Sequence, residues 1–275
     1  MRTDLIGTEL PPLTYTYTNR DALLYALSVG CGPDDLDFVY EGRGPKVLPT
    51  FAVVPPFELL FSAVRTLEMS LTRVVHGEQD IEIHRPIPAE ATVETRATVS
   101  AIQDKGKHAV CIITAKTYEQ DTELFTTTWS ILYRGGGGFG GDPGPKQELP
   151  EIADDQRADF VYEQVTRADQ ALIYRLNGDR NPLHVDPAFA EKAGFPKPIL
   201  HGLCSYGIAG RAVLSHLGND LSRFAGYWAR FTAPVFPGEV LTTEGFVQDN
   251  GQILTRTSNG SDQVVLIGLA RLQDN

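Results

Sequence analysis

A chain of 275 residues with a formal net charge of −11 at neutral pH lacks the basic surface expected of a protein that binds nucleic acid or an anionic membrane. It has no apolar run long enough to span a bilayer and no apolar signal segment near Met1. Its three cysteines, Cys31, Cys111 and Cys204, stand far apart in odd number, which argues against a zinc site and for a reducing compartment. We therefore predict a cytoplasmic protein with no nucleic-acid or membrane partner.

The first half of the chain is predicted to form two helices followed by four strands. Apolar residues recur at helical spacing over residues 19–27 and again over residues 57–69. Segments rich in β-branched and aromatic residues follow, with the alternation typical of strands. They predict strands over residues 74–83, 92–102, 108–118 and 124–133.

A glycine- and proline-rich segment, residues 135–145, divides the chain almost in half. Such a composition does not form the interior of a helix or a strand. No helix is predicted directly after its closely spaced glycines, so they do not form a dinucleotide-binding fingerprint. We predict a linker over residues 135–158, between one domain over residues 1–134 and another over residues 159–275.

The second half repeats the order of elements in the first. Helices are predicted over residues 167–176 and 203–213, and strands over residues 224–232, 240–248, 252–257 and 263–271. At a constant offset of 149 residues, Tyr25 falls on Tyr174, and Pro49 falls on Pro198. A shared offset indicates a duplicated unit. A long helix before an antiparallel sheet that wraps it gives each half an α+β architecture.

Residues 174–184 are the stretch best suited to chemistry. Gly178 permits a backbone conformation closed to other residues, and Pro182 disfavours helix before it, so we predict an ordered loop from Asp179 to His184. A carboxylate beside an imidazole can hold and transfer protons, and a desolvated pocket brings both groups toward neutral pH. Downstream, the predicted helix begins near Gly202, whose free backbone N–H can approach a developing oxyanion closely.

These segments carry a family resemblance. The pattern Tyr-x-Leu-x-Gly-Asp-x-Asn-Pro-Leu-His over residues 174–184, with Pro-Ile-Leu-His-Gly-Leu over residues 198–203, resembles the signature of the (R)-specific enoyl-CoA hydratases of the MaoC-like group, called hydratase type two. Five further segments are similar to the hydratase unit of the peroxisomal multifunctional enzyme type two: residues 37–42, 48–51, 75–79, 138–141 and 229–231. The resemblance implies a tandem hot-dog fold.

The resemblance also implies roles for individual residues. Asp179 and His184 would handle protons, Asn181 would hydrogen-bond within the site, and the Gly202 N–H would face the thioester oxygen. Arg180 stands at a variable position of the motif and is expected in solvent. Other residues would serve the substrate: His76 and Gly77 along the thioester or pantetheine path, Lys105 at the coenzyme A phosphates, and Phe231 in the pocket wall.

For several of these residues the sequence leaves a structural alternative open. His76 and Gly77 also suit a strand bend, and Lys105 suits a hairpin turn over residues 104–107. Glu41, which the resemblance implies as a supporting residue, equally suits a solvated surface position. His201 either orders the Asp179 loop or packs at the start of the helix, and we favour packing.

Two further residues of the predicted helix are interpreted as core. Cys204 and Ser205 would suit a nucleophile, but buried cysteines on apolar helices are common and inert. The first half has Gly30 opposite Asp179 and Val53 opposite Gly202, so we predict that it has lost a site of its own. A lost site would leave a widened groove, and the resemblance implies that this half accommodates the acyl tail.

The resemblance thus implies reversible hydration of a trans-2-enoyl-CoA to the (3R)-3-hydroxyacyl-CoA. The substrate would be an acyl-CoA thioester, with no metal and no cofactor apart from the carrier that the substrate brings. The same chemistry run as dehydration on an acyl carrier protein, thioesterase action, and acyl-thioester binding without catalysis are the alternatives. The two halves could pair within one chain, so both a monomer and a homodimer are compatible with the sequence.

Overall fold

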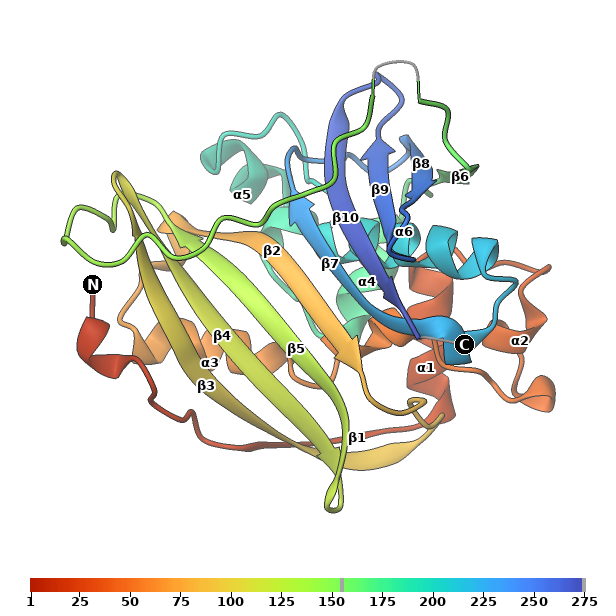
Figure 1. The fold of residues 1–275 in the computed structure, drawn as a ribbon, viewed down its shortest axis with the longest axis horizontal. Helices are drawn as coiled ribbons and strands as arrows, with labels where there is room; N and C mark the ends of the chain where they lie inside the picture. The colour runs from red at the N-terminus through yellow and green to blue at the C-terminus, as the bar shows by residue number, and fades with distance from the viewer. Residues whose placement is uncertain (154–155, 274–275) are drawn as a thin grey trace.

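A computed structural model describes residues 1–153 and 156–273 (Figure 1). Residues 154 and 155, within the predicted linker, lie outside the described part. The helices are α1 Asn19–Ser28, α2 Leu36–Val39, α3 Phe57–Thr66, α4 Gln170–Tyr174, α5 Pro187–Lys192 and α6 Gly202–His216. The strands are β1 Leu13–Tyr17, β2 Val74–Ile83, β3 Ala91–Lys105, β4 His108–Glu119, β5 Thr122–Tyr133, β6 Phe160–Val165, β7 Phe224–Phe231, β8 Val240–Val247, β9 Ile253–Ser258 and β10 Val264–Leu272.

The strands form one ten-stranded antiparallel sheet in the order β1-β3-β4-β5-β2-β7-β10-β9-β8-β6. The halves meet where β2 pairs with β7, with Gln79 opposite Ala229, and each half then contributes five strands in the same relative order. The sheet curves around the long helices α3 and α6 (Figure 1). The predicted α+β tandem hot-dog fold is confirmed.

The eight predicted strands are all present, and the sequence missed two more, β1 and β6. Both are short and lie at the two edges of the sheet, where they pair on one side only. Val161 and Val165 of β6 are 60% and 63% exposed, so this strand lacks the burial that produces a strong alternating pattern.

Helix α6 is the centre of the molecule. All residues from Leu203 to Leu214 are buried, and apart from Ser205 and Arg211 they are small or apolar, as expected of a helix that is packed on every side. A Cβ added at Gly207 would meet Val29 at 2.5 Å, and one added at Gly210 would meet Thr50 at the same distance. Small residues therefore let α6 of the second half pack closely against the first half.

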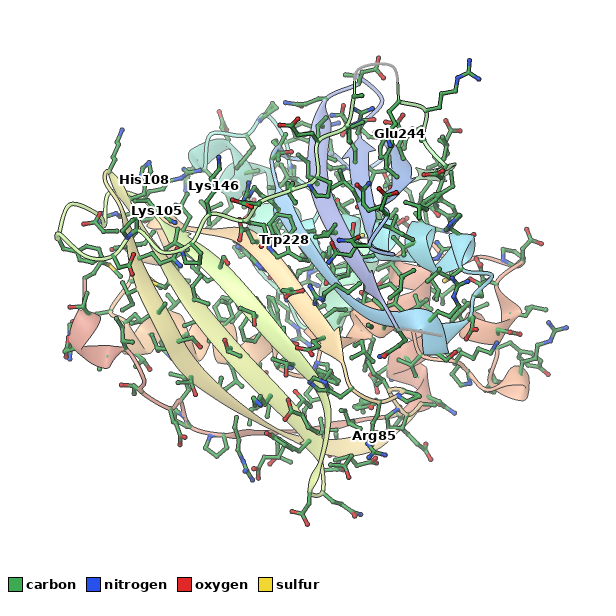
Figure 2. The ribbon with its side chains drawn as sticks, viewed as in Figure 1. Arg85, Lys105, His108, Lys146, Trp228 and Glu244 are labelled. Carbon is green, nitrogen blue, oxygen red and sulfur yellow. The ribbon has the colours of Figure 1, made fainter. Side chains whose placement is uncertain are left out.

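The segment after β5 is more than a connection. The Asp104 carboxylate accepts N–H groups from Gly138 and Gly140, and these bonds lower the pKa of that carboxyl. Further along, Leu149 and Ile152 pack against an apolar cluster that includes Trp228. The linker thus crosses the outer face of the sheet as an attached strap (Figures 1 and 2). Within the described residues, no helix combines the length and apolar character needed to span a membrane.

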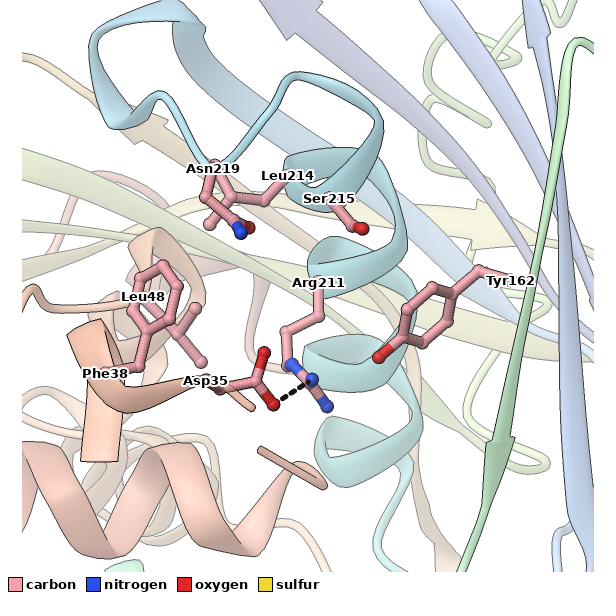
Figure 3. A pocket seen from close by; sticks show the side chains of 8 residues that line it. All are labelled: Asp35, Phe38, Leu48, Tyr162, Arg211, Leu214, Ser215 and Asn219. Carbon is pink, nitrogen blue, oxygen red and sulfur yellow. Dashed lines mark hydrogen bonds and ion pairs between the residues drawn. The ribbon is translucent and has the colours of Figure 1, made fainter. Parts of the chain in front are cut away.

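The place in the first half that corresponds to the Asp179 position is filled. A Cβ on Gly30 would lie 2.5 Å from the Gln164 side chain, whose Oε1 accepts a hydrogen bond from Arg211. The Arg211 guanidinium is buried; it also donates to the Val29 carbonyl and pairs with the Asp35 carboxylate at 3.0 Å. Figure 3 shows the pair with Asp35. A cavity of only about 40 Å³ remains beside it. Side chains from the second half therefore occupy the space at Gly30, and the acyl-tail groove expected in the first half stays a prediction.

The Arg211–Asp35 pair should contribute to stability. Asp35→Asn removes the charge that compensates a buried guanidinium, so we expect a loss of about 1.5–3 kcal/mol in the free energy of unfolding, measured by urea denaturation. Asp37→Asn is the matched control, since Asp37 pairs with Lys46 on the surface and such pairs contribute about 0–1 kcal/mol. Equal losses in the two variants would contradict the structural role of the buried pair.

Candidate active site

Asp179 and His184 lie on an irregular segment that follows α4, as the sequence predicts. A 3-10 turn, Arg175–Asn177, leads to Gly178, whose φ of +125° is rarely open to residues with a side chain. His184 ends a second short turn, Pro182–His184, which the Asn181 side chain caps by accepting the Leu183 N–H at 3.1 Å. The segment therefore reverses direction and brings both side chains to one place.

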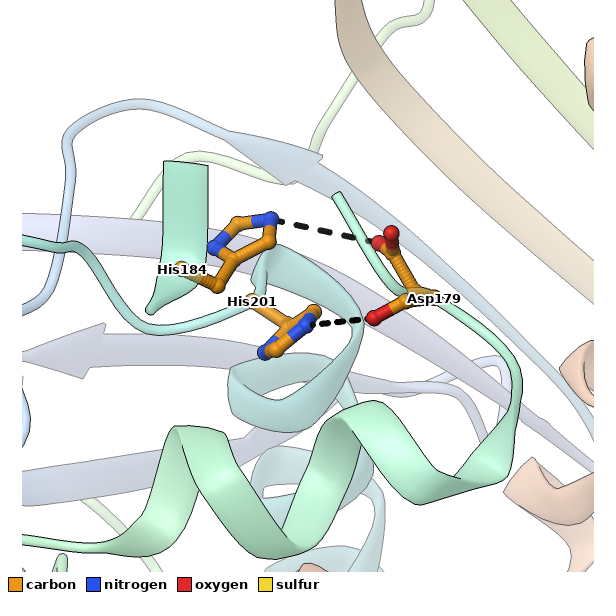
Figure 4. Close-up of side chains that lie close together, drawn as sticks. All are labelled: Asp179, His184 and His201. Carbon is orange, nitrogen blue, oxygen red and sulfur yellow. Dashed lines mark hydrogen bonds and ion pairs between the residues drawn. The ribbon is translucent and has the colours of Figure 1, made fainter. Parts of the chain in front are cut away.

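The two side chains face each other. Nε2 of His184 is 3.9 Å from Oδ2 of Asp179, and the side chains are 9% and 18% exposed (Figure 4). This separation is too long for a direct hydrogen bond, but one water molecule can bond both atoms at about 2.8 Å. The pair is thus spaced to hold a water between a carboxylate and an imidazole.

Hydrogen bonding sets the tautomer of His184. Its Nδ1 donates to the Ile199 carbonyl at 2.9 Å, so the neutral ring presents the lone pair of Nε2 to Asp179. Burial lowers the pKa of His184, although the nearby carboxylate opposes this, and burial raises the pKa of Asp179. The Asp179 Oδ1 accepts the Asn181 N–H at 3.2 Å, which leaves Oδ2 as the atom facing His184.

His201 contacts both members of the pair. Its Nε2 donates to the backbone carbonyl of Asp179 at 3.1 Å, and its ring stacks on that of His184 with centroids 3.7 Å apart. It is 1% exposed at the N-cap position of α6, and burial lowers its pKa far below the ordinary imidazole value. The neutral His201 ring therefore does both things that the sequence left open: it packs at the start of α6, and it holds the backbone of the Asp179 loop.

These three residues also have the composition of a metal site, since each places a ligand atom within 4.8 Å of the others. The two imidazole planes, however, are stacked at an angle of 25°. Ring lone pairs lie in the ring planes, so in stacked rings they run side by side and do not converge on one ion. His184 Nδ1 and His201 Nε2 are already engaged with carbonyl oxygens. The arrangement suits proton transfer better than metal binding.

Gly202 opens the second side of the site. It is the first residue of α6 and is exposed, and the first helical bonds to His201 come from the N–H groups of Cys204 and Ser205. The Gly202 N–H therefore precedes the hydrogen-bonded part of the helix, at its positive end. The ring of Phe231 lies 3.2 Å from where a Cβ on Gly202 would be, so a side chain at this position requires that ring to shift by a few tenths of an ångström.

The structure brings some of the other predicted residues to this place. The His76 ring meets the Phe231 ring edge-on at 5.1 Å and donates from Nε2 to the Glu78 carbonyl, and burial lowers its pKa to about 4. Gly77 is the unpaired residue of a β-bulge in β2, as the strand-bend alternative predicts. These residues join Gly202 where the two halves meet.

Two of the predicted site residues, Lys105 and Glu41, lie elsewhere. Lys105 is in the β3–β4 hairpin, where its Nζ donates to the Pro143 carbonyl of the linker (Figure 2). Strand β3 is three positions from β2 in the sheet, roughly 14 Å at ordinary strand spacing, so only a long ligand joins Lys105 to His76. Glu41 is exposed on a 3-10 turn, and Arg180 is exposed beside Asp179. Cys204 is buried and its Sγ bonds the Ser28 carbonyl, and burial raises its pKa, so it is no activated nucleophile.

The sequence did not identify the residues that form the wall beyond Asp179. A cavity of about 10 Å³ adjoins the carboxylate, and it is lined by Val53, Val54, Phe57, Tyr174, Asn177, Asp179 and Leu203. Three of these come from the first half, which therefore completes the site of the second. The only sequence signal was the offset of 149 residues that sets Val53 opposite Gly202.

Comparisons with known proteins identify the family of the chain. Residues 15–135 match the family model described as the MFE-2 hydratase 2 N-terminal domain, and residues 151–268 match the MaoC like domain. "Probable enoyl-CoA hydratase 2" of Dictyostelium discoideum is 39% identical over 98% of this chain and 95% of that protein. "3-hydroxyacyl-thioester dehydratase Y" of Mycobacterium tuberculosis is 43% identical over 94% of this chain and 91% of that protein.

A solved structure is similar over its whole length. The MaoC-like dehydratase from Phytophthora capsici matches with a TM-score of 0.88 and 30% identity, covering 100% of both chains. These findings agree with the resemblance seen in residues 174–203: two family models match in succession along the chain, two relatives are covered almost end to end, and one solved structure matches. The chain belongs to the hydratase 2 family, with an MFE-2 hydratase 2 N-terminal domain followed by a MaoC-like domain.

Proposed function

We propose that this protein catalyses the reversible hydration of trans-2-enoyl-CoA to (3R)-3-hydroxyacyl-CoA, and that Asp179, His184 and the Gly202 N–H carry the reaction. The observation that carries the proposal is the facing pair of Asp179 and His184, 3.9 Å apart and largely buried, next to the Gly202 N–H at the start of α6, which has no backbone acceptor within the described residues. The relatives named as an enoyl-CoA hydratase and as a 3-hydroxyacyl-thioester dehydratase support it, because these names describe the two directions of one reaction.

In the proposed mechanism a water donates one hydrogen to Asp179 Oδ2 and the other to His184 Nε2. Its oxygen lone pair then points away from both groups, toward the β-carbon of the enoyl thioester. As the C–O bond forms, electrons move into the thioester carbonyl, whose oxygen accepts the Gly202 N–H. One water proton passes to the pair, and the pair returns one proton to the α-carbon from the same side. Asn181 keeps Asp179 oriented by donating its N–H to Oδ1.

The surrounding residues are proposed to receive the two ends of the substrate. The acyl tail would extend along the wall that Val53, Val54 and Phe57 form, where the cavity of about 10 Å³ would have to widen to admit it, and the thioester would pass Phe231, His76 and Gly77. Lys105 would meet the coenzyme A phosphates only after it leaves the Pro143 carbonyl. A supporting role of Glu41 and (3R) stereochemistry are carried over from the sequence resemblance.

The function is tested with trans-2-enoyl-CoA substrates of graded chain length, in buffer containing a metal chelator. We expect loss of the conjugated thioester, a 3-hydroxyacyl product that chiral chromatography assigns as (3R), and no free thiol. A (3S) product, or thiol release without a hydroxyacyl product, would contradict the proposal, the latter in favour of a thioesterase. Parallel assays on acyl carrier protein substrates distinguish the two carriers, and full activity with chelator agrees with a reaction that needs no metal.

The pH dependence of kcat/KM should reflect the pair. Protonation blocks the acceptor atoms that hold the water, so activity is lost as pH falls. Burial lowers the pKa of His184 below the ordinary 6.5 and raises that of Asp179 above the ordinary 3.8. We expect one acid limb between these values, belonging to the coupled pair. A midpoint above 6.5, in protein that remains folded by circular dichroism, would contradict the assignment.

A cytoplasmic location remains part of the proposal, supported by three cysteines that are free and buried. A homodimer and a monomer both remain compatible with a sheet whose two halves already pair through β2 and β7.

A further inference from the structure

The Asp179 loop is attached to the first half of the chain through Ser28, the last residue of α1. The Ser28 side chain is fully buried, and its Oγ accepts a hydrogen bond from Asn177 Nδ2 at 2.8 Å. The Ser28 Oγ in turn donates to the Tyr25 carbonyl at 2.7 Å. Asn177 ends the 3-10 turn that leads through Gly178 into Asp179, so the bond holds the stem of the loop.

Two more bonds fix Ser28 itself. Its carbonyl accepts Gln170 Nε2 at 2.6 Å, from the start of α4, and Cys204 Sγ at 3.3 Å, from the first turn of α6. The backbone of Ser28 is thus held by both helices that flank the proposed site. Only the bond from its Oγ continues to Asn177 and so toward Asp179.

The position of this contact in the repeat explains its geometry. Ser28 and Asn177 are 149 residues apart, the offset that relates the two halves, and so are Tyr25 and Tyr174, whose rings lie 6.3 Å apart. Equivalent residues that meet each other lie close to the approximate twofold axis between the halves. The stem of the Asp179 loop therefore lies near this axis, in contact with the first half.

We propose that Ser28 is a positioning residue for Asp179, so that the half without a catalytic pair fixes the geometry of the pair in the other half; this rests on the proposed function. The other hydrogen bonds that hold the loop, from His201 to the Asp179 carbonyl and from the Asn181 N–H to Asp179 Oδ1, come from the second half. The Ser28 bond is the hydrogen bond by which the first half restrains the loop within the described residues. A water bridging two atoms 3.9 Å apart tolerates little movement of either.

The test is Ser28→Ala in the full-length protein. The variant removes the Oγ and leaves the carbonyl that Gln170 and Cys204 bond. We expect kcat for enoyl-CoA hydration to fall about 10- to 100-fold with KM changed less than about twofold, because misplacing a catalytic group by about 1 Å can cost about 100-fold. The matched control is Thr117→Val. It removes an equally buried hydroxyl in the first half's sheet, together with its 2.8 Å hydrogen bond to the Thr95 hydroxyl.

A double-mutant cycle distinguishes positioning from general destabilisation. Asn177 Nδ2 also donates to the Tyr174 carbonyl at 2.9 Å, so Asn177→Ala can cost more than Ser28→Ala; if Ser28 acts through Asn177, the double variant should lose no more in kcat than Asn177→Ala alone. Independent losses that multiply, or Ser28→Ala with wild-type kcat while folded, would overturn the proposal. A kcat loss in Thr117→Val as large as that in Ser28→Ala would do the same.

Hydrogen–deuterium exchange separates this inference from the proposed function. We expect faster exchange of the amides of residues 177–181 in Ser28→Ala and unchanged exchange there in Thr117→Val. Should the wild-type protein hydrate no enoyl thioester, the proposed function fails and the exchange measurement alone decides whether Ser28 restrains the loop. Unchanged exchange in residues 177–181 would overturn the restraint itself.

Discussion

Asp179→Asn is expected to lower kcat for hydration of a short trans-2-enoyl-CoA by about 100- to 10,000-fold, the range of a general acid–base contribution. Asparagine has nearly the shape of aspartate and can still accept the Asn181 N–H through its oxygen. The amide group then faces His184 and donates where the carboxylate accepts, so the water loses one of its two acceptors. The measurement is the steady-state rate, with circular dichroism as the folding control.

Two further variants make this result interpretable. Asp220→Asn, at an exposed carboxylate that caps a 3-10 turn, should remain within about twofold of the wild-type rate because asparagine caps about as well as aspartate. Asp179→Asn combined with His184→Gln should cost about as much as either change alone, because groups that act as a unit are not additive. A folded Asp179→Asn protein with near wild-type activity would refute the assignment of the pair.

Gly202→Pro is expected to lower kcat by about 100- to 1,000-fold, the cost of one oxyanion donor. Proline removes the N–H that the mechanism assigns to the thioester oxygen. Gly202 is the first residue of α6, the helical position where proline is best tolerated. His201 before it already has an extended backbone, with ψ of 133°, as a residue before proline prefers. The helix should therefore form while its first N–H is lost.

Gly202→Ala is the steric control for that variant. It retains the N–H and adds a Cβ 3.2 Å from the Phe231 ring, so a modest loss is expected from displacement of that ring. Gly202→Pro should be slower than Gly202→Ala by at least tenfold, with both proteins folded by circular dichroism. Equal rates in the two variants would mean that the Phe231 contact, and not the amide, explains the effect, and the oxyanion role of Gly202 would be wrong.

Much of the fold was predictable because it follows local spacing. The apolar periodicity of residues 57–69 and 203–213 located α3 and α6, and alternation located eight of the ten strands. The edge strands were missed for different reasons: β1 is only five residues long, and in β6 exposed positions carry Val161 and Val165, which obscures the alternation. The filled position at Gly30 was missed as well, because Arg211 and Gln164, which occupy it, come from the other half.

The candidate site likewise has residues that the sequence predicts and residues that only the tertiary structure places. Asp179, Asn181 and His184 lie within six residues, so Gly178 and Pro182 suffice to predict a loop that presents them together. By itself, the sequence determined the duplicated architecture, the hydratase-like motif and the helix that begins at Gly202. Only the tertiary structure decided that His201 stacks on His184, that Val53, Val54 and Phe57 wall the site, and that Ser28 holds its loop. Spacing along a chain sets the geometry of neighbours, whereas contacts between residues 149 positions apart depend on how two packed halves come together.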